Sequence, residues 1–282
     1  MQMMKVFALM TGLTVLLVVA GDYLGGPSMA LAMLIFAVVM NVGAYWFSDR
    51  AVLRMYRAKV IGPDDAPELY TMVDRLRSEA NLPMPTIAIA PSEQPNAFAT
   101  GRNQNHAVVC VTSGILQLIS ARELEGVIAH ELAHIKHRHM LVGTVAATVA
   151  GAIAMLASVA KWGLFLGRGR RSNGGGNLIV MIAMMIIAPM AAMIIQMMIS
   201  RSNEFQADAT AARITSDPVG LASALQKIEG YARKIPMEVN PAAAQLAIIN
   251  PLAGSAGDTV SRFFSTHPPT EKRVAKLRGM RI

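Results

Sequence analysis

Four long stretches of the chain are almost free of charged residues, and they dominate its pattern of hydrophobic and polar positions. They cover residues 6–21, 29–47, 140–160 and 178–200. A helix needs about 20 consecutive apolar residues to cross the hydrocarbon core of a bilayer. The last three stretches meet this length, and the first does so when the methionines before it are included. The pattern predicts two hydrophobic helical hairpins, which we place at residues 1–48 and 140–200.

The first stretch also has features of a signal peptide, because a basic residue precedes the apolar run and small residues precede Gly21. A second apolar stretch follows it closely, and a tight hairpin accounts for both. Basic residues in short loops face the cytoplasm. Arg50, Arg54 and Arg57 follow the first hairpin, which predicts a cytoplasmic location for both chain ends and for residues 48–138. The tip of the second hairpin is basic instead, so either the rule fails there or that hairpin is partly re-entrant.

Shorter periodic segments outside the hairpins predict a mixed domain of helices and strands. Apolar positions recur at helical spacing in residues 66–82. Short strands separated by Pro, Asn and Gly are predicted within residues 85–92, 96–101 and 106–112. Further helices are predicted at 114–119, from 121 through the histidine-rich segment, and at 201–214, 218–234 and 269–279. We therefore expect one soluble unit built from two parts, residues 49–139 and 201–282.

The composition agrees with a membrane protein. Hydrophobic residues make up 53% of the chain and charged residues only 16%, which is far from the surface chemistry of a soluble globule. The net charge of +8 comes with only 5% aromatic residues, and no basic run is interleaved with aromatics, so we expect no nucleic-acid partner. The single cysteine, Cys110, lies in an apolar strand-like run and is predicted to be buried rather than nucleophilic.

The segment HELAH is the strongest chemical signal in the chain. His130 and His134 are four residues apart on a predicted helix, so both imidazoles project from one face and can bind one metal ion. Glu131 projects beside them. Zinc lowers the pKa of a bound water towards 7, and an adjacent carboxylate can accept the proton of that water. His137 lies too far along the helix to join the same centre, and His139 is predicted to point to the opposite face.

A third ligand is predicted from the segment RSNEFQAD. A catalytic zinc site usually has three protein ligands, and Glu204 stands where the chain returns from the second hairpin. Because both ends of a hairpin lie on the same side, Glu204 can reach the two histidines. Asp208 lies four residues later on the same helical face and can accept the free N–H of a ligand histidine, most simply His130.

These residues resemble the HtpX family of bacterial membrane zinc metalloproteases, which is related to the CAAX prenyl proteases. The resemblance covers nearly the whole chain and rests on FSDRAVLRMYRA, PNAFATG, HELAHIKHRH, SRSNEFQAD and STHPPTEKR. It implies an α+β fold: a predominantly helical integral membrane protein with a zincin-like (gluzincin) catalytic domain, a small β-sheet and two hydrophobic helical hairpins. It also implies one Zn²⁺ held by His130, His134 and Glu204, with Glu131 as general base.

The resemblance assigns roles to further residues. It implies an edge strand along which the substrate lies, made of Asn96, Ala97, Phe98, Ala99, Thr100 and Gly101; taken alone, the segment predicts only a hairpin strand that ends in glycine. It implies that His267 stabilises the oxyanion, with Arg273 nearby, although His267 before Pro268 also fits a simple helix start. This chain has His139 where the family usually has an acidic residue.

The sequence thus predicts a zinc endopeptidase of the inner membrane with its site on the cytoplasmic face. Its substrates are expected to be misfolded or damaged membrane proteins. The enzyme itself is expected to contact the lipid bilayer and to work alongside other quality-control proteases. One alternative is an intramembrane-cleaving zinc protease, but charged residues flank HELAH and no later apolar stretch supplies an aspartate ligand. A second is a non-catalytic scaffold with structural zinc, which would not need Glu131. A transporter is disfavoured because the apolar stretches lack ionisable residues.

Overall fold

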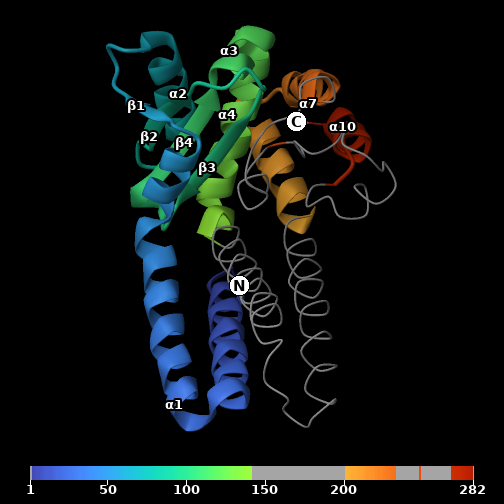
Figure 1. Cartoon of the computed structure of the whole chain (residues 1–282). Coiled ribbons are helices and arrows are strands. Elements are labelled where there is room, and N and C mark those ends of the chain that lie inside the picture. Colours follow the sequence, from blue (N-terminus) through green and yellow to red (C-terminus); the bar gives the residue numbers. More distant parts are fainter. Residues whose placement is uncertain (1, 142–200, 233–247, 249–267, 282) are drawn as a thin grey trace.

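The structure is a computed structural model of the 282-residue chain. It describes residues 2–141, 201–232, 248 and 268–281. A long helical hairpin lies at one end of the molecule, and a small sheet with its covering helices lies at the other (Figure 1). The predicted second hairpin, residues 140–200, falls almost wholly outside the described residues.

The hairpin is formed by α1 (Gln2–Met55), which consists of two helices that meet at a sharp bend. Gly25 and Gly26 have non-helical backbone angles there, and Gly26 takes a positive φ of 68° that favours glycine. The two legs contact each other through Leu13, Leu17 and Ala37. The Asn41 side-chain amide also donates to the Thr14 hydroxyl at 3.1 Å. The structure thus has two apolar helices in the region where a hairpin is predicted at residues 1–48, and the second helix continues to Met55.

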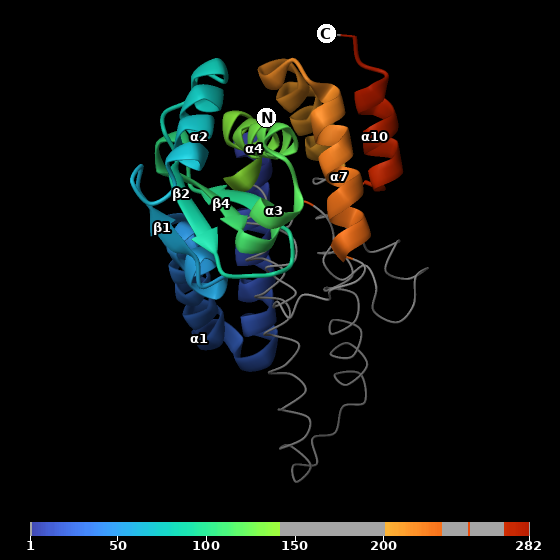
Figure 2. The ribbon, with the colours of Figure 1, turned by 90° about the horizontal axis from the view of Figure 1, so that it is seen from above.

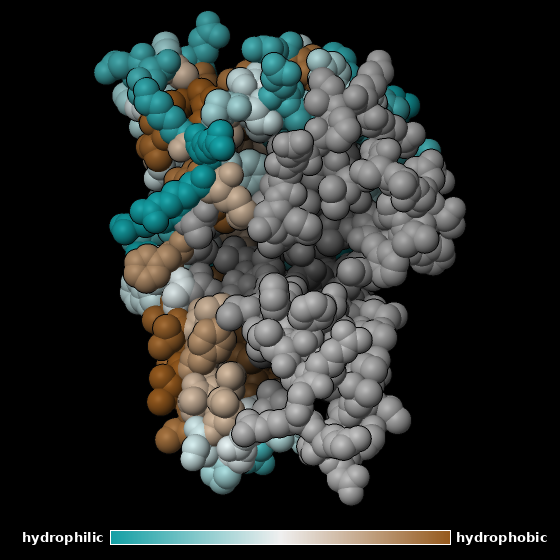
Figure 3. Space-filling view, viewed as in Figure 1, coloured by the Kyte–Doolittle hydropathy of each residue, from teal (hydrophilic) through white to brown (hydrophobic). Residues whose placement is uncertain are grey.

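Both legs are long and apolar enough to cross a bilayer, over Val6–Tyr23 and Gly25–Phe47. Their outward-facing side chains are exposed hydrophobic residues, including Val15, Ile35 and Val39. Figure 3 shows this brown, hydrophobic surface over the hairpin and teal, hydrophilic side chains over the other end of the molecule. Exposed apolar surface of this extent is unfavourable in water and favourable in lipid. The hairpin therefore fits a membrane environment.

A four-stranded mixed sheet carries the soluble part of the chain. Its strands are β1 (Lys59–Ile61), β2 (Thr86–Ala90), β3 (Ala97–Gly101) and β4 (Ala107–Thr112), in the order β1-β2-β4-β3. β2 and β4 run parallel, and the two outer strands pair antiparallel with them. The three strands predicted from sequence are confirmed. The short β1 was not predicted, because three residues with an exposed start carry no alternating pattern.

Helices cover both faces of this sheet. On one face, α2 (Pro67–Glu79) and α4 (Ala121–Lys136) bury apolar residues in the main core, next to the short α3 (Ser113–Leu118). On the other face, the end of α1 packs Val52 and Tyr56 against Phe98, and the Tyr56 and Phe98 ring centroids are 4.5 Å apart. Cys110 is fully buried in this second cluster, as predicted.

The C-terminal elements lie on the side of α4 away from α2, and only some of them touch α4 directly. They are the helix at 201–215, α7 (Pro218–Ala232) and α10 (Thr270–Arg278). Seen from above, α4 lies between the sheet and α7, and α10 lies beside α7 (Figure 2). Gly126 permits the approach of α7, because a Cβ at this position would come within 2.8 Å of the Leu221 backbone. This arrangement brings residues 201–215 alongside the helix of the HELAH motif.

Candidate metal centre

The first half of the site is built on α4. Ser120 caps the helix: its side chain accepts from the Glu123 backbone N–H, and the Glu123 carboxylate accepts from the Ser120 backbone N–H. This reciprocal pair satisfies two free backbone donors and fixes where the helix begins. Most of α4 after this turn is buried in the core. The two histidines of HELAH therefore project from a helix that is rigidly held on several sides.

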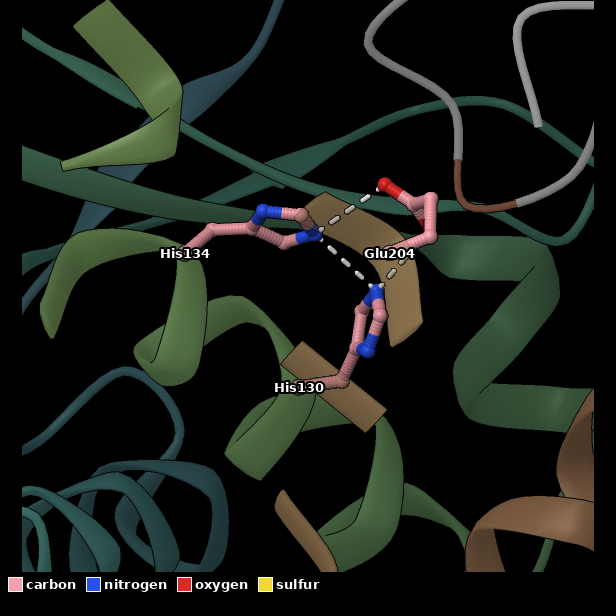
Figure 4. A group of neighbouring side chains, drawn as sticks. All are labelled: His130, His134 and Glu204. Atoms are coloured by element: carbon pink, nitrogen blue, oxygen red, sulfur yellow. Dashed lines mark hydrogen bonds and ion pairs between the residues drawn. The ribbon is translucent and has the colours of Figure 1, made fainter. Parts of the chain in front are cut away.

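His130, His134 and Glu204 converge on one point, as Figure 4 shows. The two histidine Nε2 atoms are 3.1 Å apart, and the Glu204 carboxylate oxygens lie 3.5 Å from His130 Nε2 and 3.4 Å from His134 Nε2. One nitrogen or oxygen from each residue lies within 4.8 Å of the others. Among the described residues, no second group of three His, Cys, Asp or Glu side chains meets this criterion.

This donor set fits a zinc ion. Two imidazole nitrogens and one carboxylate oxygen are a common ligand set of catalytic zinc, and such a set leaves a fourth position open. His130 and Glu204 are almost completely buried, and His134 is partly exposed. Burying these polar groups so close together is costly unless something balances them. A divalent cation at their centre provides that balance.

Asp208 holds the far side of His130, as the sequence predicted. Its Oδ1 lies 3.0 Å from His130 Nδ1. A ligand histidine that donates its outer N–H to a carboxylate keeps its other nitrogen free for the metal. Burial alone would lower the pKa of His130, but its contacts with Asp208 and Glu204 outweigh this effect and raise the pKa to about 9. The two carboxylates therefore favour positive charge at this ring, which a bound divalent cation would also supply.

Arg273 on α10 is a central part of the site rather than a nearby residue. Its guanidinium is fully buried and donates two hydrogen bonds to the Asp208 carboxylate, at 2.9 and 2.7 Å. It also lies 3.4 Å from Glu204 and 3.3 Å from His130 Nε2, and donates to the Ile248 carbonyl. Burial raises the pKa of Asp208, but the Arg273 charge outweighs burial and brings the pKa down to about 2. Asp208 is therefore fully ionised.

Glu131 is buried beside the two histidines, on the helix face turned towards β3. Burial raises its pKa above the usual value, the nearby Glu204 adds to the rise, and His130, His134 and a hydrogen bond from the Ala99 backbone oppose it. The net effect is a carboxylate that binds protons more strongly than an exposed one. It is also in contact with the strand predicted to bind substrate.

The predicted substrate strand is β3, and it stands at one end of the sheet. It pairs with β4 in antiparallel register, with Ala99 opposite Val109. Asn96 precedes it and is buried: its backbone N–H donates to Thr112 Oγ1 at 2.9 Å, and its side-chain oxygen accepts from the Ile248 N–H at 3.1 Å. All five residues of β3 are buried. The strand is thus an edge strand by topology, and its surroundings are closed.

The prediction for His139 was wrong. It does not point to the opposite face but lies buried beside the metal centre, with its Nδ1 3.2 Å from His134 Nδ1. The helical projection fails because α4 ends at Lys136 and Arg138 has a positive φ of 59°, which turns the chain back. His137 lies outside the metal-binding group, as predicted. Burial lowers the pKa of both rings, that of His139 to about 3, so both are neutral near pH 7.

His267, the predicted oxyanion residue, lies outside the described residues. Thr270 to Arg278 form the predicted C-terminal helix, and its position places Arg273 in the site. The structure therefore brings together six predicted site residues, five of them named from their own spacing and Arg273 only from the family resemblance: His130, Glu131, His134, Glu204, Asp208 and Arg273. Sequence reasoning missed His139, for which the only signal is a histidine directly after the turn that ends the helix.

Comparison with known proteins agrees with this geometry. Residues 63–281 match peptidase family M48. The chain belongs to this family. It is 54% identical over 280 residues to a protein named Protease HtpX homolog from Gemmatimonas aurantiaca, and the match covers 99% of each chain. A protein of the same name from Desulforapulum autotrophicum is 54% identical over 272 residues, which are 96% of this chain and 87% of that protein. The chain is thus an HtpX-type protease of family M48.

The fold of this M48 member is also similar to a solved structure. The crystal structure of S. mikatae Ste24p superimposes with a TM-score of 0.55 at 17% sequence identity. The similarity covers 98% of this chain and 64% of that one. At this identity it shows the fold alone. Together with the family match, it supports a membrane metalloprotease of mixed α+β fold with a small sheet and apolar N-terminal helices.

Proposed function

We propose that this protease is a zinc-dependent endopeptidase that cleaves misfolded or damaged membrane proteins at the cytoplasmic face of the inner membrane. The observation that carries the proposal is the convergence of His130, His134 and Glu204, with Glu131 beside them on the same helix. A structural metal site needs ligands but no proton acceptor. The buried carboxylate of Glu131 is therefore unexplained by the scaffold alternative and expected for a hydrolase.

The residues divide the work of peptide hydrolysis as follows. When bound, zinc supplies a Lewis acid that polarises the scissile carbonyl and makes the attacking water more acidic. Glu131 takes the proton of that water at a carboxylate oxygen and then passes it to the leaving amine. Its raised pKa favours the first transfer. We assign stabilisation of the oxyanion to His267, with Arg273 holding Asp208 and, through it, His130.

Substrate is proposed to bind along β3 as an added strand. The order of the sheet supports this, because β3 has a sheet partner on only one side among the described strands. Ladder hydrogen bonds would hold the peptide backbone without reading its side chains. Since the strand is buried, binding requires that its edge first becomes accessible. Strand addition also requires an extended peptide, which a misfolded or damaged protein supplies more readily than a folded one.

The location is supported by the end of α1. Arg50, Arg54 and Arg57 are exposed where the apolar hairpin gives way to the sheet, and basic residues at such positions favour the cytoplasmic side. The metal ligands on α4 lie beyond the candidate spans, within the domain that contains the sheet. This placement favours cleavage near the membrane surface over the intramembrane alternative.

One experiment with three variants tests the proposal. The detergent-purified protein and its Glu131→Gln variant should contain one zinc per chain, but only the parent should cleave casein. Glu204→Ala should lose both zinc and activity, because only two of the three protein ligands remain. Glu125→Gln, an acidic residue on the same helix that pairs with Arg75 at the surface, is the matched control and should behave as the parent. Full activity in Glu131→Gln, or unchanged zinc in Glu204→Ala, would reject the mechanism.

A further inference from the structure

A chain of hydrogen bonds leads away from the outer nitrogen of His134. His139 Nδ1 lies 3.2 Å from His134 Nδ1, and His139 Nε2 lies 3.2 Å from Gln206 Oε1. The Gln206 side-chain nitrogen lies 3.3 Å from His137 Nδ1, and His137 Nε2 lies 2.8 Å from Thr210 Oγ1. This series of hydrogen bonds begins on the HELAH helix and crosses to the helix at 201–215 at Gln206. It then returns to the turn at His137 and ends on the helix at 201–215, at Thr210.

The Gln206 amide sets the direction of every proton in this chain. Its oxygen can only accept, so His139 must donate from Nε2. A neutral ring carries one proton, so the Nδ1 of His139 must accept from His134 Nδ1–H. His134 is then left with a bare Nε2. That is the atom which faces His130 and Glu204.

The other half of the chain agrees with this direction. The amide nitrogen of Gln206 can only donate, so His137 accepts at Nδ1 and carries its proton on Nε2. That Nε2–H then donates to the Thr210 hydroxyl, at 2.8 Å. Reversing the amide would make His139 donate from Nδ1 and would leave the proton of His134 on Nε2. The ring nitrogen that faces the metal centre would then be blocked.

We infer that His139, oriented by Gln206, is a positioning residue that fixes the metal-binding tautomer of His134, as Asp208 does for His130. The inference rests on the proposed zinc centre. The two ligand histidines are thus held by different groups. His130 contacts the Asp208 carboxylate, which is paired with Arg273, and His134 contacts the neutral ring of His139.

The arrangement also joins the two halves of the site. Gln206 and Thr210 lie on the helix that supplies Glu204, whereas His137 and His139 follow the helix that supplies His134. The His137 and His139 rings stack with centroids 5.3 Å apart, which places both beside Gln206. These contacts therefore help to fix the position of His134 relative to Glu204, in addition to the metal that both would bind.

The test measures how fast zinc leaves the protein. Full-length protein in the Glu131→Gln background is loaded with zinc, and its loss to excess chelator is followed by a chelator-based absorbance signal. His139→Leu should lose zinc about 10-fold faster, the lower end of the effect of removing such a partner. His139→Asp should stay close to the parent rate, because a carboxylate also accepts the His134 Nδ1–H. If the residue only fills space, leucine rather than aspartate will keep the parent rate, and the inference is overturned.

A second variant tests whether Gln206, which lies outside the buried core, acts through His139. Gln206 is exposed, and Gln206→Met should speed zinc loss by a smaller factor, about 3-fold if half of the His139 effect depends on its orientation. The double variant with His139→Leu should lose zinc no faster than His139→Leu alone. Additive effects would show that Gln206 does not act through His139. A parent without zinc would instead overturn the proposed function itself.

Discussion

Two ion pairs in this protein have the same chemistry and opposite exposure, and they give a sharp test of what holds the site together. Arg273 donates two hydrogen bonds to Asp208 with both side chains almost fully buried. Arg122 donates two hydrogen bonds to Asp217, but its side chain is 67% exposed. We predict that Arg273→Met strongly destabilises the fold and that Arg122→Met changes it little.

The magnitude follows from what each change leaves behind. Without Arg273, the Asp208 carboxylate remains buried and loses its bidentate guanidinium partner, and loss of one partner of a buried pair costs about 3–5 kcal/mol. A cost of 1 kcal/mol lowers the melting temperature by roughly 2–4 °C in a domain of this size, so the expected drop is roughly 6–20 °C. Without Arg122, Asp217 is solvated by water and salt, and exposed pairs contribute little.

Thermal unfolding in detergent, followed by tryptophan fluorescence at fixed zinc concentration, measures both shifts. The double variant Asp208→Asn, Arg273→Met should be more stable than Arg273→Met alone, because it removes the unbalanced charge. An Arg273→Met shift as small as that of Arg122→Met would refute the claim that burial makes this pair decisive.

Two further predictions concern α4 and its neighbours. Hydrogen bonds from Lys227 and from serines outweigh burial and lower the pKa of Glu123 to about 2. The ionised Glu123 side chain therefore stabilises the fold above about pH 4.5, and this stabilisation is lost as pH falls towards 2. This stabilisation should be on the order of 2 kcal/mol, because solvent screens the half-exposed Lys227. In Glu123→Gln, the melting temperature should therefore fall less steeply between pH 6 and 3 than in the parent. An unchanged slope would contradict this. Gly126→Ala should destabilise by about 1–3 kcal/mol because its new methyl group meets the Leu221 backbone. At the control Gly230→Ala, the new methyl group meets no atom of the described residues within 4 Å, so the change should be neutral or stabilising by up to about 1 kcal/mol. Equal effects at both sites would refute the packing argument.

Much of the site could be read from sequence because its residues lie on regular helices. His130 and His134 are one turn apart, as are Glu204 and Asp208, and helical geometry fixes which side chains meet. The same rule failed for His139 because the helix had already ended. A single residue with positive φ is enough to change the direction of every side chain after it.

The sheet shows the same limit in another form. Short segments separated by Pro, Asn and Gly identified the strands at 86–90, 97–101 and 107–112, but not that the first and third run parallel. Pairing depends on contacts between segments distant in sequence, which no local pattern contains. The bidentate pair between Arg273 and Asp208 was likewise invisible, because sixty-five positions separate the two residues.

That separation has a consequence for the timing of synthesis. A growing chain emerges with both histidines first, then Glu204 and Asp208, and the Arg273 guanidinium only 143 residues after His130. Until it arrives, Asp208 lacks the guanidinium that donates two hydrogen bonds to its buried carboxylate. The buried pair that holds Asp208 beside His130 can therefore form only after residue 273 has been synthesised, long after the metal ligands themselves.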